Sequence, residues 1–187
     1  MTGPIARRFG TARGMVRLFL SHAEVALKQA GIVEADPASV RRLVFVCHGN
    51  ICRSAFADGL AHDQGLNSLS FGLSTSSGLG AYPPVVDAAM SFDVNLTGHR
   101  TARIEDYIPE PGDLLLAMEA RQLRRIAGMS GLTSRPRTLL GLFADPRTPH
   151  LHDPFGLDDA YLGTCLGHIK SAVINLGSVF PGARACG

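Results

Sequence analysis

Residues 43–54 read Leu-Val-Phe-Val-Cys-His-Gly-Asn-Ile-Cys-Arg-Ser, and this stretch constrains the fold more than any other part of the chain. The apolar residues 43–46 predict a short buried strand, and at Cys47 the pattern changes to a small polar loop that ends with Arg53 and Ser54. Apolar residues then recur at helical spacing as far as Gln64, so Ser54 is predicted to be a helix N-cap. The sequence therefore predicts a strand, a tight loop and a helix in direct succession.

A loop of this kind is a predicted anion site. Its backbone N–H groups point inward, and the dipole of the following helix adds positive potential at the same place. That potential favours the thiolate, which is the nucleophilic form, of Cys47 at the start of the loop. Arg53 follows six positions later, and its planar guanidinium can hold two oxygens of a tetrahedral oxyanion. The spacing therefore favours phosphate.

The Cys-x5-Arg-Ser pattern after an apolar strand resembles the phosphate loop of the low-molecular-weight protein tyrosine phosphatases, bacterial type. Residues 47–54 match that family's longer Cys-x-Gly-Asn-x-Cys-Arg-Ser signature, and further matches lie at residues 76–80, 99–100 and 113–118. The resemblance covers residues 43 to about 180. It implies an α/β fold of the Rossmann or flavodoxin-like kind, with a four-stranded parallel sheet and helices on both faces. It also implies that the chain hydrolyses phosphotyrosine in proteins through a phosphocysteine intermediate, without a cofactor or a metal ion.

The family's general acid is an Asp-Pro pair late in the chain, and Asp153 in Leu-His-Asp-Pro-Phe-Gly resembles it. An Asp-Pro pair is more often only a turn, and Asp145-Pro146 is a second candidate. The position of Asp153 just before the closing helix and beside Phe155 favours it as the acid that protonates the leaving group and then activates water. The resemblance implies that the phosphate is surrounded by His48, Gly49, Asn50, Ile51, Cys52 and Ser54.

Three loop residues have two interpretations each. Ser54 resembles the family's hydrogen-bond donor to the thiolate as well as an N-cap. Asn50 resembles a brace of the loop backbone, and the alternative is an ordinary turn residue. Cys52 is either a buried small residue or the partner of Cys47 in a reversible disulfide that protects the nucleophile.

Tyr82 and Phe155 are the candidate walls of a slot for a flat phenol ring, although packing within a loop or the core explains Tyr82 equally well. Ile51 points to the same substrate, because relatives that favour phosphoarginine tend to carry Thr there. We expect His48 to be an exposed loop residue and His99 to be a structural hydrogen-bonding residue.

The chain departs from the family pattern at four positions, and none is expected to touch Cys47, Arg53 or Asp153. These positions are Ala55, Glu119, Gln122 and Gly156.

The length of 187 residues allows one domain and an appendage. Four cysteines, at positions 47, 52, 165 and 186, do not form a disulfide framework or zinc-finger spacing, which favours a reducing, cytoplasmic compartment without a structural metal. The arginines are scattered without an aromatic stacking surface, which argues against nucleic-acid binding. No apolar run is long enough to span a membrane.

Residues 1–42 lie outside the resemblance and form a predicted N-terminal extension to a catalytic domain at 43–187. Residues 1–10 show no periodicity and are predicted to be mobile, whereas residues 11–30 predict an amphipathic helix ended by Gly31 and followed by a linker at 34–39. The helix has two interpretations: it packs on the catalytic domain or on its own copy in a homodimer, or it attaches to a membrane surface. Its apolar stripe consists of Ala12, Val16, Phe19, Leu20, Ala23, Leu27 and Ala30.

The remaining pattern alternates strands and helices, which predicts a parallel sheet with right-handed crossovers. Predicted strands lie at 68–73, 113–118 and 138–143, and predicted helices at 85–91, 120–127 and 160–179.

Two other functions compete with phosphotyrosine hydrolysis. Arsenate reductases of similar fold use the same loop but need two further cysteines for a disulfide relay, and Cys165 and Cys186 are badly placed for one. The other alternative is a catalytically silent scaffold that binds phosphotyrosine. For a bacterial member of the family, the resemblance also implies a partner tyrosine kinase of capsule or exopolysaccharide export.

Overall fold

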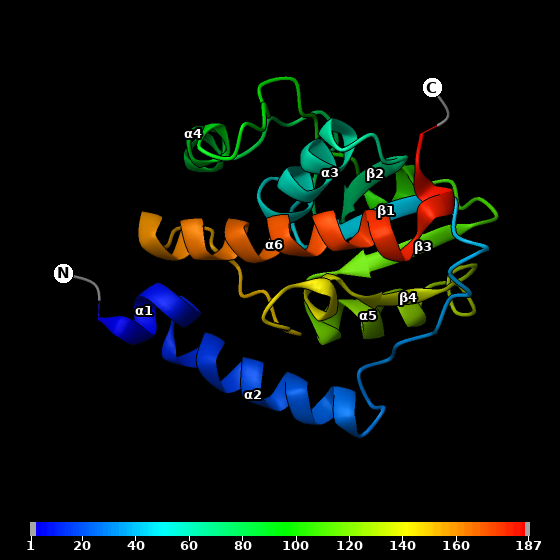
Figure 1. Cartoon of the computed structure of the whole chain (residues 1–187), viewed down its shortest axis with the longest axis horizontal. Helices are drawn as coiled ribbons and strands as arrows, with labels where there is room; N and C mark the ends of the chain where they lie inside the picture. The colour runs from blue at the N-terminus through cyan, green and yellow to red at the C-terminus, as the bar shows by residue number, and fades with distance from the viewer. Residues whose placement is uncertain (1–2, 186–187) are drawn as a thin grey trace.

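The computed structural model describes residues 3–185 and has a four-stranded parallel sheet at its centre (Figure 1). The strands follow the order β2-β1-β3-β4, and each neighbouring pair is parallel. This confirms the predicted α/β architecture. The strands are β1 (Arg42–Cys47), β2 (Ser68–Gly72), β3 (Asp113–Ala117) and β4 (Arg137–Leu139).

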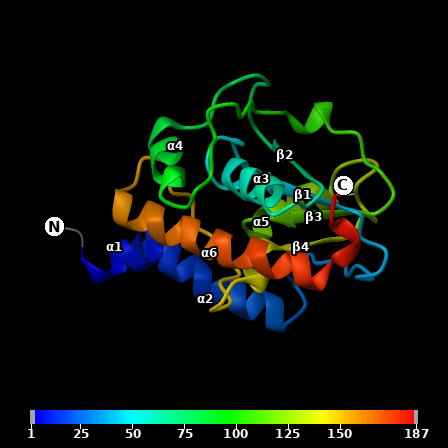
Figure 2. The same ribbon diagram turned by 45° about the horizontal axis from the view of Figure 1, so that its top comes forward.

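Helices cover both faces of the sheet, as Figures 1 and 2 show. Alternate residues of β1 explain why both faces are buried: Leu43 and Phe45 belong to the core cluster shared with α3 and α6, whereas Val44 and Val46 pack with Ile126 of α5 on the opposite face. The helices of the catalytic part are α3 (Arg53–Asp63), α4 (Pro83–Met90), α5 (Ala120–Ala127) and α6 (Asp159–Val179), with short 3-10 helices η1 (Ile104–Asp106), η2 (Leu140–Phe143) and η3 (Pro181–Ala183).

Within the catalytic part, the boundary differences of two residues or more from the sequence prediction lie at β4 and α4. The strand predicted at 138–143 ends at Leu139 and continues as η2. A side chain at Gly141 would place its Cβ 1.8 Å from the Thr148 carbonyl oxygen, so the returning chain occupies the space beside this segment. Helix α4 begins at Pro83, two residues before the predicted start, because proline is well suited to the first turn of a helix.

The N-terminal extension is more ordered than the sequence predicts. Residues 4–9, predicted to be mobile, form helix α1 (Pro4–Phe9), which packs against α6. Helix α2 (Ala12–Ala26) follows; its N-cap Thr11 accepts a hydrogen bond of 2.9 Å from the Gly14 N–H. The helix ends before the predicted stop at Gly31, because Lys28 already adopts a left-handed conformation with φ of 56°.

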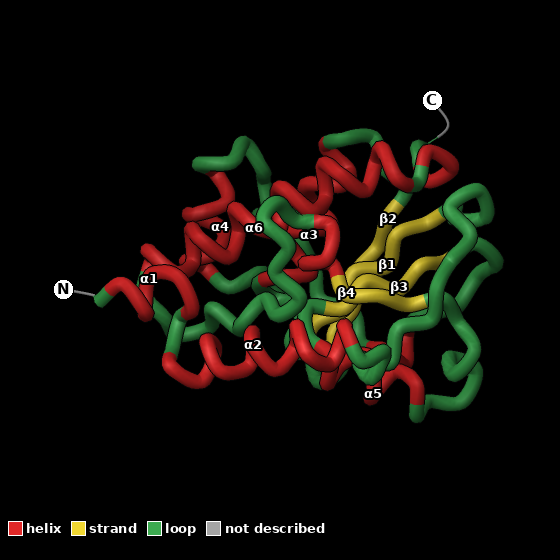
Figure 3. The backbone as a smooth tube through the Cα atoms, turned by 60° about the horizontal axis from the view of Figure 1, so that its bottom comes forward, coloured by secondary structure: helices red, strands yellow, loops and turns green. Residues whose placement is uncertain are grey.

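From Ala12 to Leu27 the apolar stripe faces away from the body of the molecule. Gly14 and Ser21 on the opposite side of the helix are buried, and α2 crosses the outside of the fold near α5 (Figure 3). The helix therefore packs on the catalytic part, as one interpretation of the sequence expected, but through the side opposite its apolar stripe. The exposed fractions are 52% for Val16, 65% for Phe19, 51% for Leu20 and 66% for Leu27.

The residues between α2 and the predicted linker at 34–39 pack against the catalytic part. Ala30 is buried in a cluster with Leu123 and Leu139. Val33 then forms an antiparallel bridge to Arg137, with two backbone hydrogen bonds of 2.9 Å. This bridge covers part of the outer edge of β4, which would otherwise present unpaired backbone groups.

Within residues 3–185, we find no helix that combines the length and the apolar character needed to cross a bilayer.

Candidate active site

The loop after β1 lies at the carboxyl end of the sheet, where β1 is flanked by β2 and β3. The chain leaves β1 toward β2 on one side and reaches β3 on the other, so this is the switch point of the sheet, the usual ligand site in open α/β folds. Helix α3 begins at Arg53, and its N-cap is Cys52 rather than the predicted Ser54. Ser54 lies one residue inside the helix, so its hydroxyl is free to point into the loop.

Cys47 is buried at the base of this loop and receives two polar contacts. Its Sγ lies 2.9 Å from the Ser54 hydroxyl and 3.2 Å from the Asn50 backbone nitrogen. The Asn50 side-chain amide donates to the same Ser54 oxygen at 2.9 Å. Because an amide NH₂ can only donate, Ser54 accepts that bond and its own proton is available to the sulfur.

Asn50 holds the loop in shape. It is buried and has a φ of 54°, a left-handed conformation that Asn tolerates better than most residues. Its side-chain nitrogen also donates to Ser70 at 3.0 Å, and its side-chain oxygen accepts from the Ala102 N–H at 2.9 Å. Its carbonyl oxygen lies 2.7 Å from Nε2 of His99. Together with its bonds to Cys47 and Ser54, Asn50 thus makes five fixed contacts that set the loop conformation before any ligand arrives.

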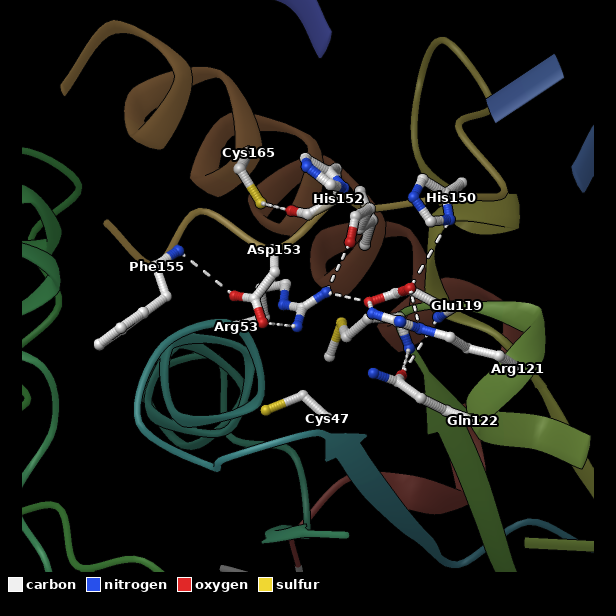
Figure 4. Close-up of polar contacts among 12 residues, drawn as sticks. Cys47, Arg53, Glu119, Arg121, Gln122, His150, His152, Asp153, Phe155 and Cys165 are labelled. Carbon is white, nitrogen blue, oxygen red and sulfur yellow. Dashed lines mark hydrogen bonds and ion pairs between the residues drawn. The ribbon is translucent and has the colours of Figure 1, made fainter. Parts of the chain in front are cut away.

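Arg53 brings three distant segments together, as Figure 4 shows. It is only 1% exposed, and its Nη1 donates to Glu119 and to the Leu151 carbonyl, both at 2.8 Å. Its Nη2 contacts the Asp153 carboxylate at 2.7 Å. Its Nε is buried and has no hydrogen-bond partner within the described chain. A buried unpaired donor costs free energy, so an oxyanion in the loop would meet a donor already in place.

Glu119 is a site residue that the sequence reasoning missed. The expectation that the departures from the family pattern avoid Arg53 is wrong at this position, because the Glu119 carboxylate pairs with Arg53 and, at 2.6 Å, with Arg121. Burial alone would raise the pKa of Glu119, but the two guanidinium groups lower it to about 2. Its position just after β3 could have indicated this role. Strands β1 and β3 are parallel neighbours, so the residues that follow them lie at the same edge of the sheet.

Asp153 lies on the loop that leads into α6 and is one wall of the site. Its side chain is 34% exposed, and its Oδ1 accepts the Phe155 N–H at 3.3 Å. The loop is attached to the sheet by a hydrogen bond from the Leu151 N–H to the Met118 carbonyl at 3.0 Å. The competing Asp145 is exposed, does not line the cavity beside Cys47, and uses its backbone N–H to bind Ser171.

Two histidines of the same loop connect the site to its surroundings. His150 is buried beside Glu119, at 4.0 Å, and burial lowers its pKa to about 4 despite the nearby carboxylate. His152 bonds through Nε2 to the Thr11 hydroxyl at 3.1 Å, while its carbonyl accepts from Tyr161. The contact with Thr11 ties the N-terminal extension to the residue next to Asp153, which no sequence signal indicated.

A cavity of about 380 Å³ opens above Cys47. Phe155 lines it, whereas Tyr82 does not and instead packs on the Phe155 ring with centroids 4.7 Å apart. Leu79 also lines the cavity, along with Ile51, and its role was not predicted from the sequence. The lining comprises Cys47, His48, Gly49, Ile51, Cys52, Arg53, Ser74, Thr75, Ser76, Leu79, Asp153 and Phe155.

The thiols of Cys47, Cys52 and Cys165 are all free and buried, and Cys186 lies outside the described residues. Burial is the largest cause that raises the pKa of the Cys52 thiol, and nearby Asp153 adds to it. The same effect raises the pKa of Cys165 within α6 to about 12. Neither thiol is therefore a ready nucleophile at neutral pH.

The chain is similar to known phosphatases. Residues 42–180 match the family model described as low molecular weight phosphotyrosine protein phosphatase. Among curated relatives, "Low molecular weight protein-tyrosine-phosphatase Wzb" of Escherichia coli is 34% identical over 90 residues, and "Probable low molecular weight protein-tyrosine-phosphatase EpsP" of Ralstonia nicotianae is 29% identical over 89 residues. These alignments cover 47% and 46% of this chain and 61% of each relative.

Solved structures give the same comparison over a longer range. The YwlE mutant from Bacillus subtilis is 26% identical, with a TM-score of 0.64, over 74% of this chain and 97% of that one. A further YwlE structure, called an arginine phosphatase, is 25% identical with a TM-score of 0.62, over 73% of this chain and 93% of that one. An arsenate reductase of Staphylococcus aureus is a weaker match, 28% identical over 81 residues, covering 42% of this chain and 60% of the relative.

The family model spans most of the chain and includes the loop, the buried arginine and the Asp153 loop that converge on Cys47. The protein therefore belongs to the low molecular weight phosphotyrosine protein phosphatase family.

Proposed function

We propose that this protein hydrolyses phosphotyrosine in proteins, with Cys47 as nucleophile, Arg53 as phosphate ligand and Asp153 as general acid. The observation that carries the proposal is the convergence of three groups on one cavity: a hydrogen-bonded thiol, a buried guanidinium with an unpartnered Nε, and a carboxyl that is about one-third exposed. Each group supplies one requirement of phosphoryl transfer, namely a nucleophile, charge stabilisation and a proton.

In the first step the Cys47 thiolate attacks phosphorus, and the bond between phosphorus and the phenolic oxygen breaks. Asp153 gives its proton to that oxygen, so tyrosine leaves neutral and phosphocysteine remains. Loop N–H groups and the Arg53 guanidinium hold the non-bridging oxygens. Phosphate replaces Asp153 as a ligand of Arg53, because a buried guanidinium binds the more highly charged oxyanion better than one carboxylate.

In the second step Asp153, now a carboxylate, takes a proton from a water molecule that attacks phosphorus. The phosphorus–sulfur bond breaks, inorganic phosphate leaves and the thiolate returns. The Ser54 hydroxyl, 2.9 Å from the sulfur, stabilises the departing thiolate by donating to it. Asn50 keeps that hydroxyl oriented by donating to its oxygen.

The cavity supports an aromatic substrate. Ile51, Leu79 and Phe155 give it apolar walls above the polar floor at Cys47, which suit a phenyl ring better than a guanidinium. This favours phosphotyrosine over phosphoarginine. Tyr82 contributes indirectly by packing on the Phe155 ring.

The cellular setting is also part of the proposal. Free thiols in the described chain support a reducing, cytoplasmic compartment in a bacterium. By analogy with the family, the phosphoprotein partner is a tyrosine kinase of polysaccharide export.

The family match beginning at residue 42 supports a division into an N-terminal extension, 1–42, and a catalytic domain, 43–187. Cys52, buried in the same loop, is the proposed redox partner of Cys47.

The test is steady-state hydrolysis of phosphotyrosine, phosphoserine and phosphoarginine peptides, with arsenate reduction measured in parallel, in the presence of thiol. We expect turnover of phosphotyrosine alone, abolished in Cys47→Ser and reduced about 10²-fold or more in Asp153→Asn. Asp145→Asn is the matched control, because it changes the other Asp-Pro pair outside the cavity.

Two results would overturn the proposal. Phosphopeptide binding without turnover by the wild type would make the protein a scaffold. Thiol-dependent arsenate reduction without phosphotyrosine hydrolysis would make it a reductase.

A further inference from the structure

The N-terminal helices present an apolar surface that no part of the described chain covers. Along α2 and at its C-cap, Val16, Phe19, Leu20 and Leu27 each have half or more of their surface exposed. Their spacing places them in one row, and Ala12 and Ala23 lie in the same row and are also exposed. Isolated exposed apolar residues are ordinary, but a continuous helical row of them marks an interaction surface.

Contacts on the other side of α2 keep this row pointing outward. A Cβ on Gly14 would lie 2.9 Å from the His152 ring, so the helix approaches the catalytic part as closely as only glycine permits. Thr11 bonds to His152 at 3.1 Å, and Glu24 pairs with Arg124 of α5 at 3.2 Å. These contacts lie at both ends of the helix, so it cannot rotate its apolar row inward without losing all of them.

The charge around the row is strongly positive. The five basic side chains of residues 3–30 are all exposed, whereas Glu24 is the single acid of this segment and is already paired with Arg124. Arg13 and Arg17 each follow a residue of the row directly, and so lie along its edge. The five are Arg7, Arg8, Arg13, Arg17 and Lys28.

This charge distribution decides between the possible occupants. A second copy of the same face would bring a second set of arginines and no free acid, so like charges would oppose the pairing. An anionic surface complements both the apolar row and its basic edge. We propose that residues 3–28 dock on the surface of a bilayer that contains anionic phospholipids, with α2 lying in the interface plane.

The geometry fits an interfacial helix. Its 15 residues extend about 22 Å, too short to span a bilayer but long enough to lie on one. Phe19 and Leu20 enter the boundary between headgroups and acyl chains, and Arg13 and Arg17 extend their alkyl stems along the surface toward phosphate groups. Such binding is reversible and salt-sensitive, because a large part of it is electrostatic.

The test is co-sedimentation of the full-length protein with phosphatidylcholine vesicles, with and without phosphatidylglycerol, at low and high salt. We expect binding to the anionic vesicles only, and its loss at high salt. Leu20→Asp should weaken binding tenfold or more, and Arg13→Gln and Arg17→Gln should each weaken it about fivefold. The matched control is Ile174→Asp on α6, where an isoleucine is 47% exposed against 51% for Leu20.

Thermal unfolding of each variant and analytical ultracentrifugation of the wild type complete the experiment. Leu20→Asp should leave the unfolding temperature unchanged, since the side chain is half exposed. The proposal fails if the wild type does not bind anionic vesicles at low salt, or if Ile174→Asp weakens binding as much as Leu20→Asp. It also fails if the wild type is a dimer that Leu20→Asp dissociates and that does not bind vesicles.

Discussion

The phosphate loop and helix α2 differ in which of their groups they bury and which they expose. In the loop, polar atoms are buried and nearly all paired: Asn50 alone makes five contacts, two of them with Cys47 and Ser54. In α2, apolar side chains such as Phe19 are exposed, while Gly14 and Ser21 face the body. An apolar stripe in the sequence therefore predicts that a helix binds some surface, but it does not identify that surface. A contiguous polar motif is more informative, because many of its hydrogen-bonding groups pair within the motif itself.

After the loss of the nucleophile itself, the largest effect should come from replacing the buried guanidinium of Arg53. Arg53→Lys keeps the charge but removes the planar fork and the unpartnered Nε, so kcat/KM for a phosphotyrosine peptide should fall about 10³-fold. Arg121→Lys is the matched control, because Arg121 also binds Glu119 but its side chain is 62% exposed. A similar loss in both variants would mean that Arg53 acts through Glu119 and not through phosphate.

The next prediction concerns the brace of the loop. Asn50→Ala should lower the free energy of unfolding by about 3 kcal/mol, because several buried partners lose their bonds and the left-handed backbone becomes strained. Asn175→Ala, which removes one exposed bond to the Phe143 carbonyl, should cost about 1 kcal/mol or less. Denaturant unfolding measures both, and equal losses would contradict the role of Asn50 as a brace.

The pH dependence of the free energy of unfolding should depend on two buried groups near Arg53, His150 and Glu119. The folded pKa of His150 is lowered from 6.5 to about 4, so the unfolded state binds a proton first as the pH falls. Stability is therefore lost between pH 6.5 and 4, by about 3 kcal/mol for this one group. Glu119, with its pKa lowered from 4.5 to about 2, adds a further loss between those two values.

His150→Asn should reduce the slope above pH 4, where His152 and His168, whose pKa values burial also lowers, still contribute, and should leave the part due to Glu119. His22→Asn, which changes an exposed histidine on α2, serves as the control. Urea unfolding at a series of pH values measures the slopes. An unchanged slope in His150→Asn would show that this histidine is not the group responsible.

The smallest effect tests whether the two regions are coupled. Thr11→Val removes the N-cap of α2 and the contact with His152, and should cost about 1 kcal/mol of stability. It should also lower kcat about threefold, since a weak hydrogen bond next to Asp153 is lost. Thr164→Val on α6, a partly exposed threonine bonded only within its helix, is the control. An unchanged kcat would separate the extension from catalysis.

Several features of the site were predictable because they depend on short stretches of chain. The strand, loop and helix around Cys47 follow one another without interruption, and Arg53 comes from the same loop. Glu119 and Thr11 were missed because their contacts with Arg53 and His152 join residues 66 and 141 positions apart. Ser54 was misassigned as an N-cap because the helix begins one residue before it, a shift that propensity does not resolve.

The sequence by itself determined the phosphate loop, the parallel sheet and the presence of an amphipathic N-terminal helix, because local spacing and hydrophobic period encode all three. Only the tertiary structure decided that the apolar side of α2 faces outward and that Glu119 holds Arg53 in place. The physical reason is that periodicity sets which residues share a face, whereas packing between distant segments sets what that face meets.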